Sequence, residues 1–117
     1  MLGQARPRIL CVSLSSFQLK AMCESLPRRD YEVFQASTPE QAVAVCVNNH
    51  LAAVVLDSDF ASPNGWSVAQ TLRIINPHLP ILLVANGHDG DLPAGVNAVA
   101  SSFADILSKL QLLLTQR

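Results

Sequence analysis

Five short runs of apolar residues recur along the chain, and they constrain the fold more than any other feature of the sequence. Most are apolar at nearly every position, as in "AAVVLD" at 52–57 and "ILLVA" at 81–85. A strand has this pattern when both faces of its sheet are covered, which is the usual situation in parallel sheets. The predicted strands cover residues 8–14, 32–37, 52–57, 81–85 and 97–101.

The stretches between the first three runs have the spacing of amphipathic helices. Residues 15–28 carry apolar side chains at i, i+3, i+4 and i+7, which are Leu19, Met22, Cys23 and Leu26. The tetrapeptide Thr38-Pro39-Glu40-Gln41 has the form of a capping box with proline at the first helical position. It predicts a helix over 38–49.

Two further helices are predicted in the second half of the chain. One follows Asn64-Gly65 and ends at Pro77, with Val68, Leu72 and Ile75 facing inward. The other begins at Ser101 or Ser102 and has Asp105 in its first turn, where a carboxylate is favourable. Its inward stripe is predicted to be Phe103, Ile106, Leu107, Leu110 and Leu114.

Strands that alternate with helices predict a doubly wound α/β sandwich with a parallel sheet. The chain is predicted to form a single domain over 1–117, with its core at about 7–115. One connection departs from the pattern. The segment "NGHDGDLPAGV" at 86–96 holds three glycines and a proline, which are unfavourable inside a helix. The helix between strands four and five is therefore predicted to be shortened or missing.

The ends of the predicted strands bring the candidate site together. In open α/β sheets, ligands and chemistry lie beyond the carboxyl ends of the strands. Asp57 ends the third strand and is the central residue of this set. The other strand ends supply Ser13, Leu14, Ala85, Ser101 and Ser102.

The order of elements, together with "YEVFQASTPEQA", "VVLD" followed by Asn64-Gly65, and "LPILLVA", resembles the receiver domains of bacterial two-component response regulators. The resemblance covers about residues 7–117. It implies a flavodoxin-like (βα)5 fold with sheet order 2-1-3-4-5. It also implies that Asp57 matches the aspartate that accepts a phosphoryl group from a histidine kinase.

Several positions depart from the pattern of that family. The acid pair that helps hold Mg²⁺ at the end of the first strand is replaced by Ser13 and Leu14. The hydroxyl residue that contacts the phosphoryl group at the end of the fourth strand is replaced by Ala85. The lysine at the end of the fifth strand is replaced by Ser101 or Ser102, and the nearest lysine is Lys109 in the predicted last helix.

These replacements weaken the chemistry that the resemblance implies. Phosphoryl transfer to a carboxylate brings negative charges together, and a metal ion and a cation must neutralise them. Mg²⁺ is usually bound through one or two carboxylates, phosphate oxygens and water. Without the acid pair, Asp57 can instead be satisfied by hydroxyl or backbone N–H donors. No resident cofactor or metal ion is therefore expected.

Composition excludes several classes of function. The net charge is −1 and the basic residues are scattered, so no basic surface for nucleic acid is expected. The sequence contains no apolar run that could span a membrane and no signal peptide core, so a cytoplasmic location is expected. The cysteines Cys11, Cys23 and Cys46 lie in apolar patterns without CxxC spacing, which is typical of buried reduced thiols.

Other polar or aromatic residues receive structural interpretations. Asp59 is interpreted as a solvent-facing loop acid, and Asn64-Gly65 as a turn at the entry to the third helix. His88 lies in "GHDGD", which is interpreted as a solvated loop and not as a metal site. For Trp66 two readings stand side by side, a partner anchor or packing across its own helix.

The leading functional hypothesis is a stand-alone, degenerate receiver that is not an enzyme and acts by protein–protein interaction. Its expected partner is a histidine kinase or a downstream signalling protein. The first alternative is a conventional Mg²⁺-dependent receiver phosphorylated on Asp57, with Asp59, Ser13 or Ser15 in the metal shell. A remote alternative is a haloacid-dehalogenase-type phosphatase, suggested by Asp57-Ser58-Asp59 but lacking its downstream lysine and acid pair. Leu112 falls outside the apolar stripe of the last helix and leaves room for a homodimer.

Overall fold

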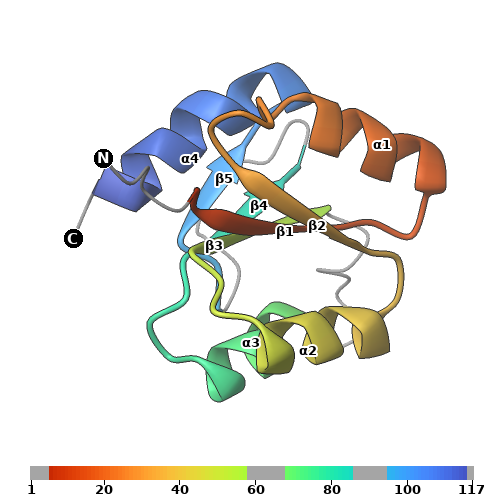
Figure 1. Cartoon of the computed structure of the whole chain (residues 1–117), viewed down its shortest axis with the longest axis vertical. Coiled ribbons are helices and arrows are strands. Elements are labelled where there is room, and N and C mark those ends of the chain that lie inside the picture. The colour runs from red at the N-terminus through yellow and green to blue at the C-terminus, as the bar shows by residue number, and fades with distance from the viewer. Residues whose placement is uncertain (1–5, 58–67, 86–94, 116–117) are drawn as a thin grey trace.

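A computed structural model describes residues 6–57, 68–85 and 95–115 of the chain. It contains one parallel sheet of five strands in the order β2-β1-β3-β4-β5 (Figure 1). The strands are β1 (Arg8–Val12), β2 (Glu32–Ala36), β3 (Ala53–Asp57), β4 (Ile81–Val84) and β5 (Ala98–Ala100). The predicted flavodoxin-like sheet order is confirmed. Each strand is one or two residues shorter than its apolar run in the sequence.

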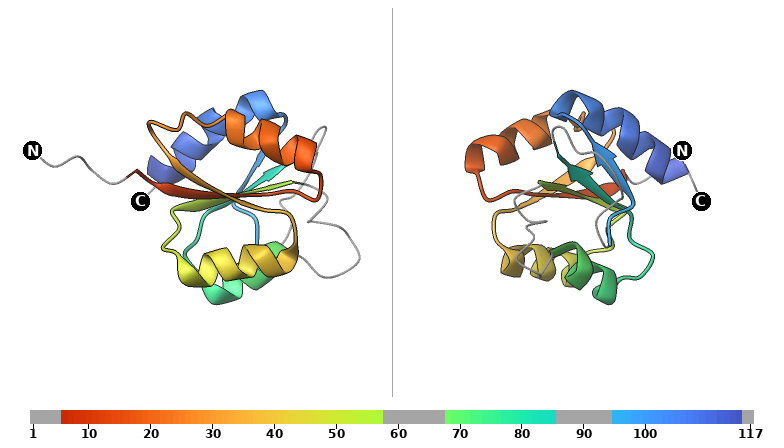
Figure 2. Two further views of the ribbon diagram at one scale, coloured as in Figure 1. Left: turned by 45° about the vertical axis from the view of Figure 1, so that its right-hand side comes forward. Right: turned by 180° about the vertical axis from the view of Figure 1, so that it is seen from behind.

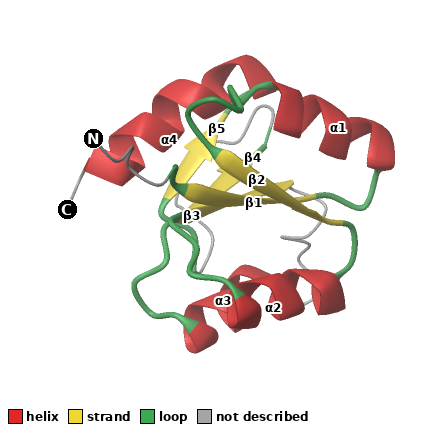
Figure 3. Cartoon of the chain, viewed as in Figure 1, coloured by secondary structure: helices red, strands yellow, loops and turns green. Residues whose placement is uncertain are grey.

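Helices cover both faces of this sheet, as the views in Figures 1 and 2 show. Helices α1 (Ser16–Glu24) and α4 (Ile106–Thr115) lie on one face, and a 3-10 turn at Phe103–Asp105 leads into α4. Helices α2 (Pro39–Asn48) and α3 (Val68–Ile75) lie on the other face. Figure 3 shows the strands as a single layer between these two helical layers. The doubly wound sandwich is therefore confirmed.

The two faces of the sheet carry separate hydrophobic cores. Successive side chains of a strand point to opposite faces, so Val55 packs toward α1 and α4 while Val54 and Leu56 pack toward α2 and α3. The same alternation holds along β1 and β4. The central strands are thus buried on both sides, which explains why their sequences are continuously apolar instead of alternating.

The start of α2 follows the predicted capping pattern with one difference. The Thr38 hydroxyl accepts a hydrogen bond from the Gln41 N–H at 3.1 Å, as expected for an N-cap. The Gln41 side chain reaches back one residue further than in a standard capping box, and its Oε1 accepts a hydrogen bond from the Ser37 N–H at 2.8 Å. The Thr38 hydroxyl thus satisfies a first-turn donor that the helix leaves without a partner, and the Gln41 side chain satisfies the backbone N–H just before the N-cap.

The inward face of α3 differs from the prediction. Val68 and Leu72 are buried as predicted, but Ile75 is 37% exposed and Ala69 is buried in its place. Ile75 lies on the same side of the helix as Val68 and Leu72, but it is the last residue of the helix. Helical spacing predicts the side of a helix on which a residue lies, and not whether the core extends as far as that residue. Ala69 is covered because the chain returns beside it, where a Cβ on Gly95 would lie 3.3 Å from the Ala69 carbonyl carbon. Gly95 also has a φ of 84°, which suits glycine.

The last helix begins in the region predicted from the sequence. Ser102 is the N-cap of the 3-10 turn, although its side chain makes no capping hydrogen bond. Ile106 and Leu110 of the predicted stripe are fully buried. The other members are partly buried against the same core, and these are Phe103, Leu107 and Leu114. Leu112 is 55% exposed, as its position outside the stripe predicts.

All three cysteines are buried free thiols, as predicted. A hydrogen bond with the Cys23 thiol and burial together raise the pKa of Cys11 well above its usual value. Burial also raises the pKa of Cys46. A raised pKa keeps a thiol protonated and unreactive, so Cys11 and Cys46 contribute apolar packing.

Some predictions fall on residues that the structure does not describe. The shortened or missing helix between β4 and β5 is one of them, because residues 86–94 lie outside the described part of the chain. Among the helices that are described, none is long and apolar enough to cross a membrane.

Candidate functional site

The candidate site lies at the carboxyl edge, which is the edge of the sheet where the parallel strands end. Asp57 is the last residue of β3 and Ser13 directly follows β1. Cys11 pairs with Val55 in the register of β1 and β3, so Ser13 continues that register opposite Asp57. Ser13 lies two positions after Cys11, and Asp57 lies two positions after Val55. Side chains alternate between the faces of a strand, so Ser13 and Asp57 point to the same face of the sheet.

Ser13 and Asp57 form a buried polar pair. The Ser13 hydroxyl donates a hydrogen bond to Oδ2 of Asp57 at 2.8 Å. Ser13 is fully buried and Asp57 is 5% exposed, and they are the buried polar residues in the described part of the chain. Water therefore has little access to the Asp57 carboxylate, and a neutral hydroxyl group stabilises it where a metal-binding acid was expected from the family pattern.

The Ser13 hydroxyl also orders the loop that follows β1. It accepts a hydrogen bond from the Ser15 N–H at 3.2 Å, while Ser15 in turn caps α1 by accepting from the Gln18 N–H at 3.3 Å. The Ser13–Ser15 contact was missed in the sequence analysis. A serine whose hydroxyl accepts from the N–H two residues later forms an ST-turn, and Ser-Leu-Ser before a helix was the signal for it.

Leu14 does not join the buried pair, because its side chain is 58% exposed. Phe17, in the first turn of α1, is 83% exposed. The position that holds the second acid in the family pattern is therefore an apolar side chain at the surface.

The described ends of β4 and β5 carry Ala85, Ser101 and Ser102 in place of the hydroxyl residue and the lysine of the family pattern. The Ala85 side chain packs against the core of the α2 and α3 face, and its N–H donates to the Ala100 carbonyl at 3.0 Å. Ser101 and Ser102 are exposed, and the Ser101 N–H donates to Oδ2 of Asp105 at 3.3 Å. Ser13 and Asp57 are thus the candidate residues that the fold brings into contact, whereas Leu14, Ala85, Ser101 and Ser102 point elsewhere or are exposed.

Several candidate residues cannot be placed. Asp59 lies outside the described residues, as do Trp66, His88 and the turn Asn64-Gly65. Within the described part of the chain, no cluster of three or more His, Cys, Asp or Glu side chains is arranged to hold a metal ion. Among the described residues that end or directly follow β1, β3, β4 and β5, Asp57 carries the single carboxylate. Mg²⁺ requires near-octahedral oxygen coordination, which this described set does not supply.

Proteins from two mycobacteria are similar to this chain in sequence. The transcriptional regulatory protein PrrA, from Mycobacterium tuberculosis and from Mycobacterium bovis, is 28% identical to this chain over 98% of its length. The chain spans about half of those relatives, at 53% of their length. No family model matches the chain.

Solved structures of response regulators and receiver domains match the fold of this chain over nearly its whole length. A response regulator from Thermotoga maritima matches with a TM-score of 0.79 at 16% identity, over 96% of this chain and 100% of that one. A CheY-like receiver domain protein from Methanospirillum hungatei matches with a TM-score of 0.74 at 21% identity, over 94% of each chain. The chain has the receiver-domain fold. The resemblance inferred from the sequence is confirmed for the fold.

The Ser13–Asp57 contact predicts a measurable loss of stability in Ser13→Ala. Removal of the hydroxyl takes a donor from a buried carboxylate, and an incompletely satisfied buried group costs about 1–3 kcal/mol of unfolding free energy. Urea denaturation followed by circular dichroism measures this loss. Ser102→Ala is the matched control, because that hydroxyl is exposed and makes no capping bond, so its effect is expected within about 0.5 kcal/mol. Equal effects of the two substitutions would show that the buried hydrogen bond contributes nothing.

Proposed function

We propose that this chain is a signalling module of the two-component type that has kept the receiver fold but does not depend on Mg²⁺-assisted phosphorylation of Asp57. Its output is a contact with another protein, either a histidine kinase or a downstream signalling protein. The fold and the relationship to PrrA support the signalling context. The bond from the Ser13 hydroxyl to Asp57 is the single observation that carries the proposal.

That bond supports the proposal for an electrostatic reason. In phosphoryl transfer, developing negative charge is stabilised by metal ions and cationic side chains placed around the acceptor. At the described edge, the acceptor position is buried beside a neutral hydroxyl, and Leu14 and Ala85 carry no charge. Asp57 then acts as part of the fold, because its carboxylate links β3 to the turn after β1.

A conventional phosphoreceiver is the second candidate. The observation in its favour is the position of Asp57, which ends β3 at the centre of the carboxyl edge, as the phosphoacceptor does in the family pattern. It requires that Asp59, whose side chain is not described, complete the metal shell with little help from the ends of β1 and β4. The phosphatase alternative has less support, because no described lysine ends or directly follows a strand.

Complementation in the source organism tests the proposed function. The gene is deleted, and its transcript profile is compared after return of the wild type or of Asp57→Asn. We expect both to restore the profile equally, because the amide keeps the shape of the carboxylate and can accept the Ser13 hydrogen bond. A matched melting temperature of the purified variant shows that it folds. A folded Asp57→Asn protein that leaves the profile in the deleted state would establish the conventional phosphoreceiver instead.

A further inference from the structure

The amino edge of the sheet, opposite Asp57, carries a large cavity. Its volume is about 810 Å³, which falls in the range of pockets that hold small molecules. Its walls come from the segments that lead into β1, β3, β4 and β5, together with Leu113 of α4. Since β3 advances by four residue steps from Ala53 to Asp57, the cavity and the carboxyl edge are separated by roughly 13 Å of strand.

Four of the side chains that line this cavity carry hydrogen-bond donors and can bear positive charge. Two guanidinium groups and two imidazoles line it, from Arg6, Arg8, His50 and His78. No aspartate or glutamate is among its lining residues in the described chain. A cavity with this lining attracts anions, and arginine in particular suits phosphate because its planar fork can donate two parallel hydrogen bonds.

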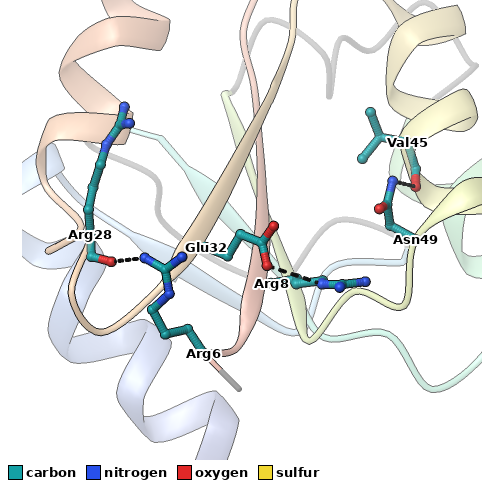
Figure 4. A network of polar contacts seen from close by, with 6 residues as sticks. All are labelled: Arg6, Arg8, Arg28, Glu32, Val45 and Asn49. Atoms are coloured by element: carbon teal, nitrogen blue, oxygen red, sulfur yellow. Dashed lines mark hydrogen bonds and ion pairs between the residues drawn. The ribbon is translucent and has the colours of Figure 1, made fainter. Parts of the chain in front are cut away.

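Contacts with the rest of the protein leave much of this donor capacity available. Figure 4 shows the Arg6 side chain at the Arg28 carbonyl and the Arg8 side chain at Glu32. The Arg8 Nε lies 3.2 Å from the Glu32 carboxylate, and both side chains are about two-fifths exposed, at 44% and 40%. Each arginine uses one nitrogen in these contacts, so its remaining N–H groups are unpaired within the described part of the chain.

Two asparagines of the cavity wall are held with their acceptor oxygens occupied. Oδ1 of Asn97 accepts from the Ile81 N–H at 2.8 Å and from the Arg73 guanidinium. Oδ1 of Asn76 accepts from the His78 N–H at 3.2 Å. Their amide NH₂ groups remain as oriented donors, and they add to the preference for an anion.

The cavity also has an apolar part, which distinguishes it from a site for an inorganic ion. Its apolar surface comes from Leu113, Pro7 and Pro80, which are partly or fully exposed, while Leu51 and Leu79 lie behind them in the core at 5% and 1% exposure. Pockets for organic ligands commonly combine such apolar walls with a few placed polar groups. We propose that this cavity at the amino edge binds an organic phosphate of about mononucleotide size, with the phosphate at the arginines and histidines and the organic group against Leu113, Pro7 and Pro80.

Isothermal titration calorimetry of the whole chain tests this site, with adenosine monophosphate, adenosine and inorganic phosphate as probes. We expect the monophosphate to bind at one site with a dissociation constant below about 1 mM, and each of the other probes to bind at least about tenfold more weakly. Absence of binding by the monophosphate up to about 10 mM would overturn the proposal. Equal affinity for inorganic phosphate would show that the organic group makes no contact with the apolar wall. Equal affinity for adenosine would show that the phosphate makes no contact with the arginines and histidines.

Substitutions assign the binding to the cavity. Arg8→Gln removes a charged guanidinium fork and His78→Gln removes an imidazole from the lining, and each should weaken binding of the monophosphate by about tenfold or more. Arg29→Gln is the matched control, because it removes the same charge from an exposed side chain outside the cavity and should leave the affinity unchanged. Equal weakening by Arg8→Gln and Arg29→Gln would show diffuse attraction to a cationic surface. A melting curve for each variant confirms that it folds, and His78→Gln retains the test if Arg8→Gln does not.

Discussion

Incubation with acetyl phosphate and Mg²⁺ is expected to label this chain at least about 10²-fold more slowly than a receiver domain that carries the acid pair, the strand-four hydroxyl and the strand-five lysine. Loss of one charge-stabilising donor typically costs about 10²–10³ in rate. Three kinds of group differ from the family pattern here, at Ser13 and Leu14, at Ala85, and at Ser101 or Ser102. Their effects do not add in full, because groups that act as a unit are strongly non-additive.

Intact mass spectrometry measures this labelling as the gain of one phosphoryl group against time. Asp57→Asn is the control that assigns any gain to the strand-end carboxylate, and omission of Mg²⁺ separates metal-assisted transfer from background acylation. Rapid stoichiometric labelling of the wild type that is lost in Asp57→Asn would contradict the proposal. It would also require that residues outside the described ranges, Asp59 among them, supply the missing charge stabilisation.

Leu56→Ala is expected to have the largest effect on folding, with a loss of about 2–5 kcal/mol in unfolding free energy. Leu56 is fully buried in β3, which is hydrogen-bonded to β1 on one side and to β4 on the other. Truncation removes apolar contacts with the core beneath α2 and α3 and leaves a cavity that the paired strands cannot readily close. Because domains of this size are stable by only about 5–15 kcal/mol, a substantial part of the stability is lost.

Urea denaturation followed by circular dichroism tests this expectation, and Leu112→Ala is its matched control. The same atoms are removed there from a side chain that is 55% exposed on α4, so the expected change is within about 0.5 kcal/mol. If Leu112→Ala were as destabilising as Leu56→Ala, the exposed face of α4 would be buried in solution. Sedimentation at two protein concentrations would then show whether a second copy covers it.

The parallel sheet could be predicted because the information is local and repeated, whereas its strand order was an expectation from the resemblance to receiver domains. The runs of β1, β3 and β4 are buried on two faces, and the alternation of Val54 and Val55 between the two cores explains why both positions are apolar. The helix start at Thr38 was predictable for a related reason, since capping residues are favoured at particular positions. The buried role of Ile75 was wrongly predicted because periodicity reports an angle around a helix and not a position along it.

The candidate site, like the fold, could be predicted from the sequence only in part. The sequence places Asp57 at the end of an apolar strand, and a resemblance of pattern shows which groups around it have been replaced. It does not show that the Ser13 hydroxyl is 2.8 Å from that carboxylate, or that Leu14 turns to the surface. The cavity at the amino edge gave no signal at all, because Arg8, His50 and His78 are far apart in the chain and unremarkable one by one.

By itself, then, the order of apolar runs and caps determined the layers, the parallel sheet and the strand on which Asp57 lies. Periodicity and capping act between residues a few positions apart, so a linear sequence displays them directly. Only the tertiary structure decided that Ser13 satisfies Asp57 across 44 positions, and that arginines and histidines from separate segments share one cavity. These contacts depend on strand register and on the common direction of parallel strands, which bring together residues that no local pattern connects.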